Sequence, residues 1–145
     1  MTLKNYRSEA PLLSIFRDIE KTLVDHGAKQ VARSYDGQGR TTEISFVVET
    51  KSGPLGIRLP ARFDRVEAIF KDQNIPHRPD QPYRTTWATI RDWLSAQMAL
   101  LDWEMVKLEE IFLPYAVGQD GQTFFEVVEN KGFLLGHPPG DTQSR

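Results

Sequence analysis

The stretch Asp80–Phe112, DQPYRTTWATIRDWLSAQMALLDWEMVKLEEIF, decides how the fold of this chain is interpreted. Asp80 is a suitable helix N-cap, and Pro82 falls in the first turn, where a missing N–H is tolerated. From Trp87 onward, apolar side chains recur at spacings of three and four, which predicts one long helix that ends before Pro114. The stripe consists of Trp87, Ile90, Leu94, Met98, Leu101, Met105, Leu108 and Phe112.

The same predicted helix carries a second apolar patch. At roughly 100° per residue, four apolar residues fall well away from the stripe: Trp93, Leu100, Trp103 and Ile111. A helix with apolar groups on two sides must be buried in its own domain or shared with a partner. Large aromatics on a central helix more often belong to the core, but an uncovered Trp93 or Trp103 would anchor a partner interface. Self-association into a homodimer is the linked prediction if the patch is exposed.

The composition is that of an ordinary globular domain. The 145 residues are 39% hydrophobic and 26% charged, with a formal net charge of -2, so neither disorder nor a basic nucleic-acid signature is indicated. The absence of cysteine excludes disulfides and thiolate chemistry. With no visible signal peptide or membrane-spanning run, we expect a cytoplasmic protein. We expect one domain over residues 1–136 and a disordered tail over 137–145.

The N-terminal half predicts a helix followed by an antiparallel meander and a second helix. The first helix spans about Pro11–His26 and ends at Gly27. Three strands joined by turns at residues 36–39 and 51–54 follow. They cover Gln30–Tyr35, a segment with inward Ile44, Phe46 and Val48, and a segment with inward Leu55, Ile57 and Leu59 that ends at Pro60. The second helix covers Phe63–Lys71, with Phe63, Val66, Ile69 and Phe70 facing inward.

The C-terminal part predicts a hairpin. Tyr115–Val117 and Thr123–Val128 flank a turn of Gly and Asp at residues 118–121, and Phe133–Leu135 is a candidate for one more short strand. The order of elements predicts an α+β fold. Its mostly antiparallel sheet, formed by the meander and the hairpin, packs against three helices, one of them long and central.

Asp36, Glu49 and Lys51 are the sharpest catalytic candidates. A carboxylate, an apolar strand and then Glu-x-Lys resembles the arrangement of PD-(D/E)xK nucleases, where two carboxylates hold Mg²⁺ and the lysine aids the attacking water. Asp36 and Lys51 both lie in turns, where such residues are expected without a catalytic role. A tight meander would also place the two turns at opposite ends of the second strand.

The histidines give no metal site. His26, His77 and His137 are scattered, with no second ligand at helical or strand spacing, and His26 suits the C-terminus of a helix as a cation. No Gly-x-Ser-x-Gly elbow and no glycine-rich phosphate loop are present. We therefore predict no metal and no cofactor, and binding is favoured over catalysis.

A basic-aromatic segment is the better functional candidate. Arg84 and Arg91 are nearly aligned on the long helix, and Arg62 and Arg65 share a face of the second helix. A positive rim with Tyr83 free to stack would hold phosphates and unpaired bases, although intermixed carboxylates are also typical of a solvated face. The predicted nucleic-acid-binding residues are Arg58, Arg62, Arg65, Arg78, Tyr83, Arg84 and Arg91.

The run Tyr83–Leu94, continued by Ala96–Leu100 and Phe112–Tyr115, resembles a set of short uncharacterised proteins of phages, prophages and mobile elements. The resemblance extends over most of the chain and includes Ser45-Phe46 and Leu59-Pro60. It implies a context, a small accessory protein in the host cytoplasm, and brings no activity, cofactor or catalytic residue with it.

Three hypotheses follow. The first is a non-catalytic phage-type accessory protein that binds nucleic acid or a nucleic-acid-processing complex. The second is a protein-interaction module that inhibits a host enzyme or defence system through Trp93, Trp103 and an acidic C-terminal surface. The third is the Mg²⁺-dependent nuclease. The predicted partners are thus nucleic acid, a host or phage protein, or a second copy of the chain, and no membrane.

Overall fold

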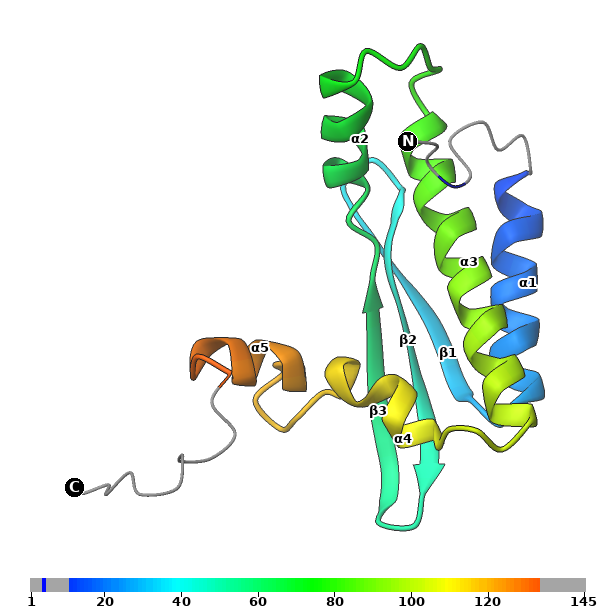
Figure 1. Ribbon diagram of the computed structural model, residues 1–145, viewed down its shortest axis with the longest axis vertical. Coiled ribbons are helices and arrows are strands. Elements are labelled where there is room, and N and C mark those ends of the chain that lie inside the picture. The colour runs from blue at the N-terminus through cyan, green and yellow to red at the C-terminus, as the bar shows by residue number, and fades with distance from the viewer. Residues whose placement is uncertain (1–3, 5–10, 134–145) are drawn as a thin grey trace.

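The computed structural model describes Lys4 and residues 11–133, and within them the chain is an α+β fold with five α-helices, as its class was predicted. Figure 1 shows α1 and α3 side by side, the sheet next to them, and α5 standing apart. The predicted tail over residues 137–145 lies outside the described residues. The elements are α1 (Leu12–Asp25), β1 (Lys29–Tyr35), β2 (Thr41–Thr50), β3 (Gly53–Pro60), α2 (Phe63–Asp72), α3 (Gln81–Asp102), α4 (Leu108–Phe112), a 3-10 helix η1 (Leu113–Tyr115) and α5 (Phe124–Asn130).

The sheet is an antiparallel meander in the order β1-β2-β3, which confirms the prediction. The β2–β3 ladder runs without interruption from Glu43 opposite Pro60 to Thr50 opposite Gly53, whereas the β1–β2 ladder contains two irregularities. The buried residues of β2 and β3 alternate because successive side chains of a strand point to opposite faces. The buried apolar ones are Ile44, Phe46, Val48, Ile57 and Leu59, while Leu55, predicted to face inward, is half-buried.

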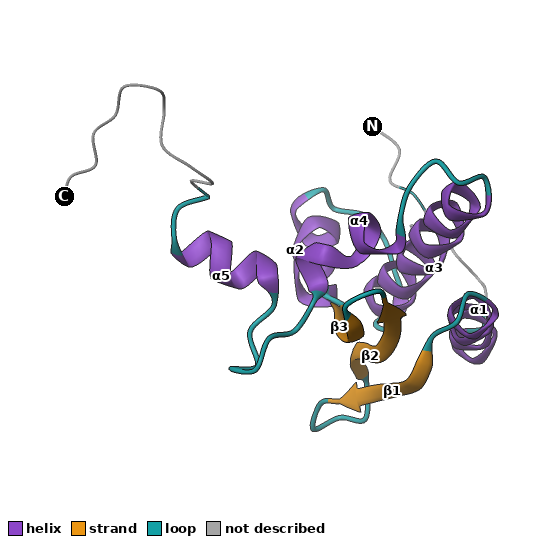
Figure 2. Cartoon of the chain, turned by 90° about the horizontal axis from the view of Figure 1, so that it is seen from below, coloured by secondary structure: helices purple, strands orange, loops and turns teal. Residues whose placement is uncertain are grey.

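Helices α1, α3 and α4 lie on the same side of the sheet and build the core against it (Figure 2). Phe16 of α1 meets Trp87 of α3 edge to face, with ring centroids 5.1 Å apart. Gly27, with φ 92°, follows α1 in the left-handed position predicted for it. In α2, Phe63 and Phe70 are buried but Ile69 is 41% exposed, so its predicted inward orientation is wrong, because α2 packs along one side against α3.

One peptide unit at the start of β2 is held by two side chains of α3. The backbone N–H of Thr41 donates to Tyr83 Oη at 2.8 Å, and Trp87 Nε1–H donates to the carbonyl of Thr41 at 3.1 Å. Tyr83 and Trp87 are four residues apart, so both reach from the same face of the helix. Thr41 is 2% exposed and lies next to the irregularity of the β1–β2 ladder between Ser34 and Tyr35, so these bonds satisfy backbone groups that solvent does not reach.

The predicted helix from Asp80 to Phe112 is wrong in its second half, because α3 ends at Asp102. The end is a Schellman motif: Met105 N–H donates to Leu100 O at 3.0 Å, and Glu104 N–H donates to Leu101 O at 2.9 Å. Glu104 occupies the left-handed position with φ 58°, where glycine is usual. Neither glycine nor proline marks this helix end in the sequence.

Beyond the break, the chain folds back over α3. Lys107 N–H donates to Glu110 Oε1 at 2.9 Å and starts α4, which buries Ile111 and Phe112. The Phe112 ring lies 5.2 Å from that of Phe46 and 6.3 Å from that of Trp93. The chain therefore covers much of its own second apolar patch, and Pro114, predicted to stop a helix, continues it as the 3-10 turn η1.

The predicted C-terminal hairpin is reduced to one bridge between Val117 and Thr123 across the turn at residues 118–121. The segment predicted as the strand Thr123–Val128 is the helix α5. Its N-terminus is a capping box in which Thr123 and Glu126 exchange hydrogen bonds with each other's backbone N–H. Phe133, predicted to start a strand, lies in the turn that ends α5, and Leu134 and Leu135 lie outside the described residues.

Replacing Tyr83 with Phe tests the contact with Thr41. The variant leaves the buried Thr41 N–H without its acceptor, so we expect the free energy of unfolding in urea to fall by about 1–3 kcal/mol. Tyr35→Phe is the control, because Tyr35 is 58% exposed and its variant should change stability by less than about 0.5 kcal/mol. Equal losses in both variants would contradict the stabilising role of the Tyr83 hydroxyl.

Replacing Glu104 with Gly tests the end of α3. A left-handed non-glycine residue costs roughly 1–2 kcal/mol, and glycine loses roughly 0.5–1 kcal/mol in backbone entropy on folding. We therefore expect a net stabilisation of about 0.5–1 kcal/mol, measured by thermal and urea denaturation. Glu109→Gly, inside α4, should instead destabilise by about 1 kcal/mol. A destabilised Glu104→Gly variant would show that its side chain, and not its backbone, matters.

Candidate binding groove

The structure separates the residues predicted to bind nucleic acid into paired and exposed groups. Tyr83 is 9% exposed, and its hydroxyl accepts from Thr41, so it is not placed to stack on a base. Arg58 donates to Glu126 Oε1 at 3.0 Å and to Gly121 O at 2.9 Å. Its charge is thus compensated within the fold.

Three more of these arginines have partners on their own helix or next to it. Arg84 pairs with Asp80 at 2.5 Å, Arg91 with Asp92 at 3.1 Å, and Arg78 donates to Gln81 at 3.3 Å. Asp80 precedes α3 as predicted, but its carboxylate binds Arg84 and makes no N-cap hydrogen bond. The hydrogen bond from Arg84, and then its positive charge, hold the pKa of Asp80 below its ordinary value. Arg62, Arg65 and Arg78 are exposed, and of these Arg62 and Arg65 form no ion pair or side-chain hydrogen bond within the described residues.

The nuclease candidates are not brought together. Asp36 lies in the β1–β2 turn, and Glu49 and Lys51 lie at the β2–β3 turn. The ten residues of β2 separate the two turns, roughly 30 Å at 3.3 Å per residue. Asp36 accepts from the backbone N–H of Arg40 and Gln38 and from the Arg40 guanidinium, and these bonds lower its pKa. Asp36 is therefore occupied in shaping its turn.

No metal-ligand cluster is found in the part of the chain that the structure describes: no three His, Asp or Glu side chains gather there. His26 lies at the end of α1 as predicted. Its Nδ1 is 2.7 Å from Thr22 O, and its Nε2 is 2.9 Å from Asp102 Oδ1. His26 thus joins the ends of α1 and α3.

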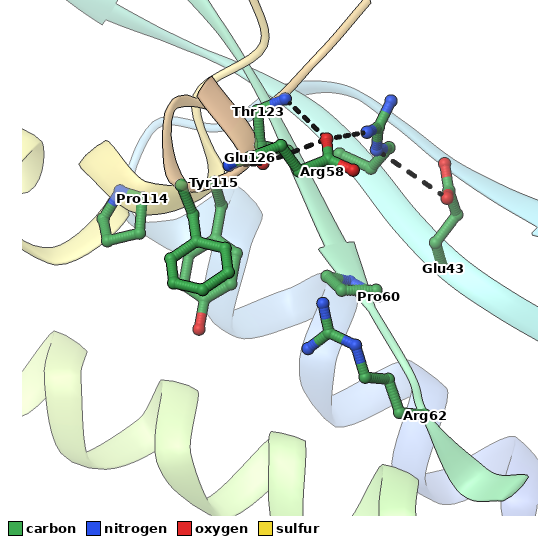
Figure 3. A pocket seen from close by; sticks show the side chains of 9 residues that line it. Glu43, Arg58, Pro60, Arg62, Pro114, Tyr115, Thr123 and Glu126 are labelled. Atoms are coloured by element: carbon green, nitrogen blue, oxygen red, sulfur yellow. Dashed lines mark hydrogen bonds and ion pairs between the residues drawn. The ribbon is translucent and has the colours of Figure 1, made fainter. Parts of the chain in front are cut away.

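Two adjoining cavities, of about 340 Å³ and 250 Å³, form a groove between β3, α3, η1 and α5. Pro60, Arg62 and Tyr115 line both cavities, which therefore adjoin each other. Figure 3 shows Tyr115 and Arg62 on facing sides of the larger cavity, with the Arg58–Glu126 pair along another side. The remaining lining residues are Glu43, Arg58, Leu59, Thr89, Ile90, Trp93, Pro114, Thr123, Phe125 and Glu126.

The aromatic wall of the groove is fixed by the fold-back after α3. Trp93 is half-buried, and its ring lies 6.0 Å from the Tyr115 ring in an edge-to-face arrangement. Phe112 supports Trp93 from the core side. Trp93 therefore belongs to the groove wall, and it is separated from Trp103, with which the sequence grouped it.

A hydrogen-bonded network closes one end of the groove. Glu126 Oε1 accepts from Thr123 N–H at 2.8 Å, from the Thr123 hydroxyl at 3.2 Å and from Arg58 at 3.0 Å. The bonds from Thr123, and then the positive charges of Arg58 and Arg62, hold the pKa of Glu126 below its ordinary value. Glu43 lies 3.9 Å from Arg58 on the other side.

A second exposed feature is the turn between α3 and α4. Trp103 is 78% exposed and Met105 is 62% exposed, and we call this pair with Glu104 the Trp103 tip. Other large apolar side chains are exposed around η1 and α5. They are Leu113, Phe124, Phe125 and Phe133.

Sequence reasoning missed Tyr115, Phe125 and Glu126 as site residues. Thr-x-x-Glu at Thr123–Glu126 is a capping-box pattern that signals a helix start, so the position of Glu126 could have been found. Tyr115 and Phe125 had no such signal, because their place in the groove depends on contacts distant in sequence.

Comparison with protein-family models, with curated proteins and with solved structures finds no match to this chain. Functional inference therefore rests on the geometry of its own residues. No helix within the described ranges combines the length and the apolar character needed to cross a membrane.

Glu126 offers a pH test of the network. Its pKa is lowered from 4.5 in the folded state, so its stabilising effect is present above the unfolded pKa and is lost as pH falls through the folded pKa. We expect the urea midpoint of the wild type to exceed that of Glu126→Gln at about pH 6 and the difference to shrink towards about pH 3. Glu129→Gln on the same helix is the control. A difference independent of pH would contradict the role of the Glu126 charge.

Proposed function

We propose that this protein is a non-catalytic interaction module that binds another protein through the Trp103 tip. The observation that supports the proposal is the exposure of Trp103, 78%, beside Met105, 62%. Tryptophan and methionine are enriched in protein interfaces, and tryptophan is prominent among binding hot spots. Asp36 lies at one end of β2, and Glu49 and Lys51 lie at the other end. This separation of the residues considered for catalysis favours a binding function over the nuclease.

The Trp103 tip is presented on a constrained turn. The Schellman hydrogen bonds from Glu104 and Met105 fix its α3 side, and Glu110 caps the start of α4. The contact between His26 and Asp102 attaches the end of α3 to α1. A preformed turn loses little conformational entropy on binding, which favours affinity.

The charge next to the Trp103 tip indicates the kind of partner. Glu104, Glu109 and Glu110 are exposed near it, so a partner with a basic rim around an apolar pocket would be complementary. We propose a host enzyme or defence protein as that partner, as expected for the interaction module considered from the sequence. The acidic surface predicted for the interaction module is therefore retained in this proposal, with Trp103 in place of the predicted pair of tryptophans.

A second candidate function is binding of nucleic acid or of a nucleic-acid-processing complex. The specific observation in its favour is that Arg62, the N-cap of α2, and Arg65, in its first turn, are both exposed. In the described chain no carboxylate lies within ion-pair distance of either guanidinium. Two such cations would contact phosphates and give a modest, salt-dependent affinity.

The discriminating experiment compares three forms of the tagged chain in capture from host lysate. They are the wild type, a Trp103→Ala/Met105→Ser variant and an Arg62→Ala/Arg65→Ala variant, each with and without nuclease treatment. We expect one protein partner to be retained by the wild type and the arginine variant, to survive nuclease treatment, and to be lost by the tip variant. With the purified partner, we expect the Trp103→Ala/Met105→Ser variant to bind more weakly than the wild type by more than about 2 kcal/mol, measured by calorimetry.

Two outcomes would overturn the main proposal. Nucleic acid that is lost only by the arginine variant would favour the second candidate. A wild type that is a dimer by light scattering, with the tip variant monomeric, would assign Trp103 to a homodimer interface, which should bury on the order of 1,200 Å² or more.

A further inference from the structure

The groove contains one guanidinium, that of Arg62, for which the described residues provide no hydrogen-bond or ion-pair partner. Arg58 is shared between Glu126 at 3.0 Å and Glu43 at 3.9 Å. Arg62, which lines both cavities, has no hydrogen bond or ion pair with any side chain in the described residues. Because burying a lone guanidinium is unfavourable, a ligand that enters this groove must bring a group that accepts hydrogen bonds from Arg62.

The rest of the groove near Arg62 is apolar and already ordered. The apolar residues that line the smaller cavity come from three elements: Ile90 and Trp93 from α3, Tyr115 from η1, and Leu59 and Pro60 from β3. The Trp93 ring is held between Tyr115 and Phe112, so this wall does not need to be ordered on binding. Cavities of 250 Å³ and 340 Å³ lie near the lower limit of ligand sites. They suit one or two side chains of an extended segment.

We propose that the groove binds an extended acidic segment of a partner protein, with an aromatic or large aliphatic side chain against Tyr115 and an Asp or Glu carboxylate on Arg62. A guanidinium and a carboxylate form two parallel charge-assisted hydrogen bonds, so one unpaired arginine is sufficient for one acidic side chain. This inference rests on the proposed protein-binding role, but it concerns a surface separate from the Trp103 tip.

The groove is less suited to nucleic acid. A strand of nucleic acid brings a phosphate at every nucleotide and needs a row of cations. Here Glu43 and Glu126 line the larger cavity together with Arg58 and Arg62, so two carboxylates match two guanidinium groups. The larger cavity is thus balanced in charge, and of its two arginines Arg62 is the one that forms no ion pair within the described residues. A single carboxylate placed on Arg62 avoids both acidic side chains.

The test uses the full chain and an array of acetylated Gly-Ser peptides that pair Phe or Leu with Asp at different spacings. Each peptide has a twin with Asn and a twin with Lys in place of Asp. Binding is followed by fluorescence anisotropy and by the indole N–H resonance of Trp93, in a Trp103→Phe background that removes the exposed tryptophan. We expect an Asp peptide to bind at least roughly tenfold more tightly than its Asn twin and to shift the Trp93 resonance.

Variants assign the effect to Arg62. Arg62→Ala should abolish the preference for Asp over Asn, Arg62→Lys should keep part of it, and Arg65→Ala, one turn along α2, should leave it unchanged. Unchanged far-ultraviolet circular dichroism and melting temperature establish that the variants are folded. Trp103→Ala should leave peptide binding intact, so failure of the Trp103 tip as a partner site and failure of the groove are distinguishable.

The proposal is overturned if no Asp peptide of the array binds at about 1 mM, if Asp and Asn peptides bind equally, or if Arg65→Ala has the same effect as Arg62→Ala. A thymidine decamer in the same assay provides the competing class of ligand. Tighter binding of this oligonucleotide than of any Asp peptide, with loss in Arg62→Ala, would assign the groove to nucleic acid.

Discussion

The contact of Tyr83 and Trp87 with the Thr41 peptide unit fixes how the main helix lies on the sheet. A buried N–H and a buried carbonyl must both find partners, and here both partners come from one face of α3. The helix can therefore neither slide nor turn over the start of β2 without leaving these groups unsatisfied. Trp87, which is fully buried, also meets Phe16, so α1, α3 and β2 are joined at this point. The C-terminal end of α3 is placed as a consequence, and the fold-back begins there.

The chain breaks the helix after Asp102 because burial of apolar side chains contributes more free energy than the strained backbone costs. Continuing the helix past Asp102 would avoid the left-handed Glu104, a saving of roughly 1–2 kcal/mol. Folding back instead buries Phe112 to 1% exposure and Ile111 to 6%, and each such side chain contributes about 1.5–3 kcal/mol. It also supplies the ring that covers Trp93. The free energy gained by burying Phe112 and Ile111 exceeds the cost of the left-handed Glu104. The apolar residues that predict one helix are therefore buried by two helices, α3 and α4.

The sequence predicted those parts of the fold that are set by local periodicity. The first helix with its terminal Gly27 and the meander are confirmed, since their patterns and turns agree with the tertiary structure. The break at Glu104 was missed because burial in the tertiary structure determines it. The helix α5 was missed because its Phe and Val residues are typical of a strand. The site was less predictable. Arg58 and Glu126 are 68 residues apart, and neither the pairing that neutralises Arg58 nor the burial of Tyr83 can be deduced from spacing along the chain.

The two surfaces proposed for binding arise from the same fold-back. When the chain reverses after Asp102, η1 carries Tyr115 next to Trp93 and completes the groove wall, while the reversal itself leaves Trp103 at the turn with 78% of its surface exposed. A straight helix would provide neither surface, because Tyr115 would be carried away from Arg62 and Trp103 would be one side chain among several on a helix face. Trp93 and Trp103, which the sequence placed in one apolar patch, thus acquire different roles. Trp93 lines a groove in which the Arg62 guanidinium has no partner within the described residues. Trp103 is exposed to solvent near several carboxylates. A partner that binds both surfaces must present basic groups to the carboxylates around Trp103 and an acidic group to Arg62 in the groove. These opposite requirements fix the orientation of the two proteins, which neither surface does alone.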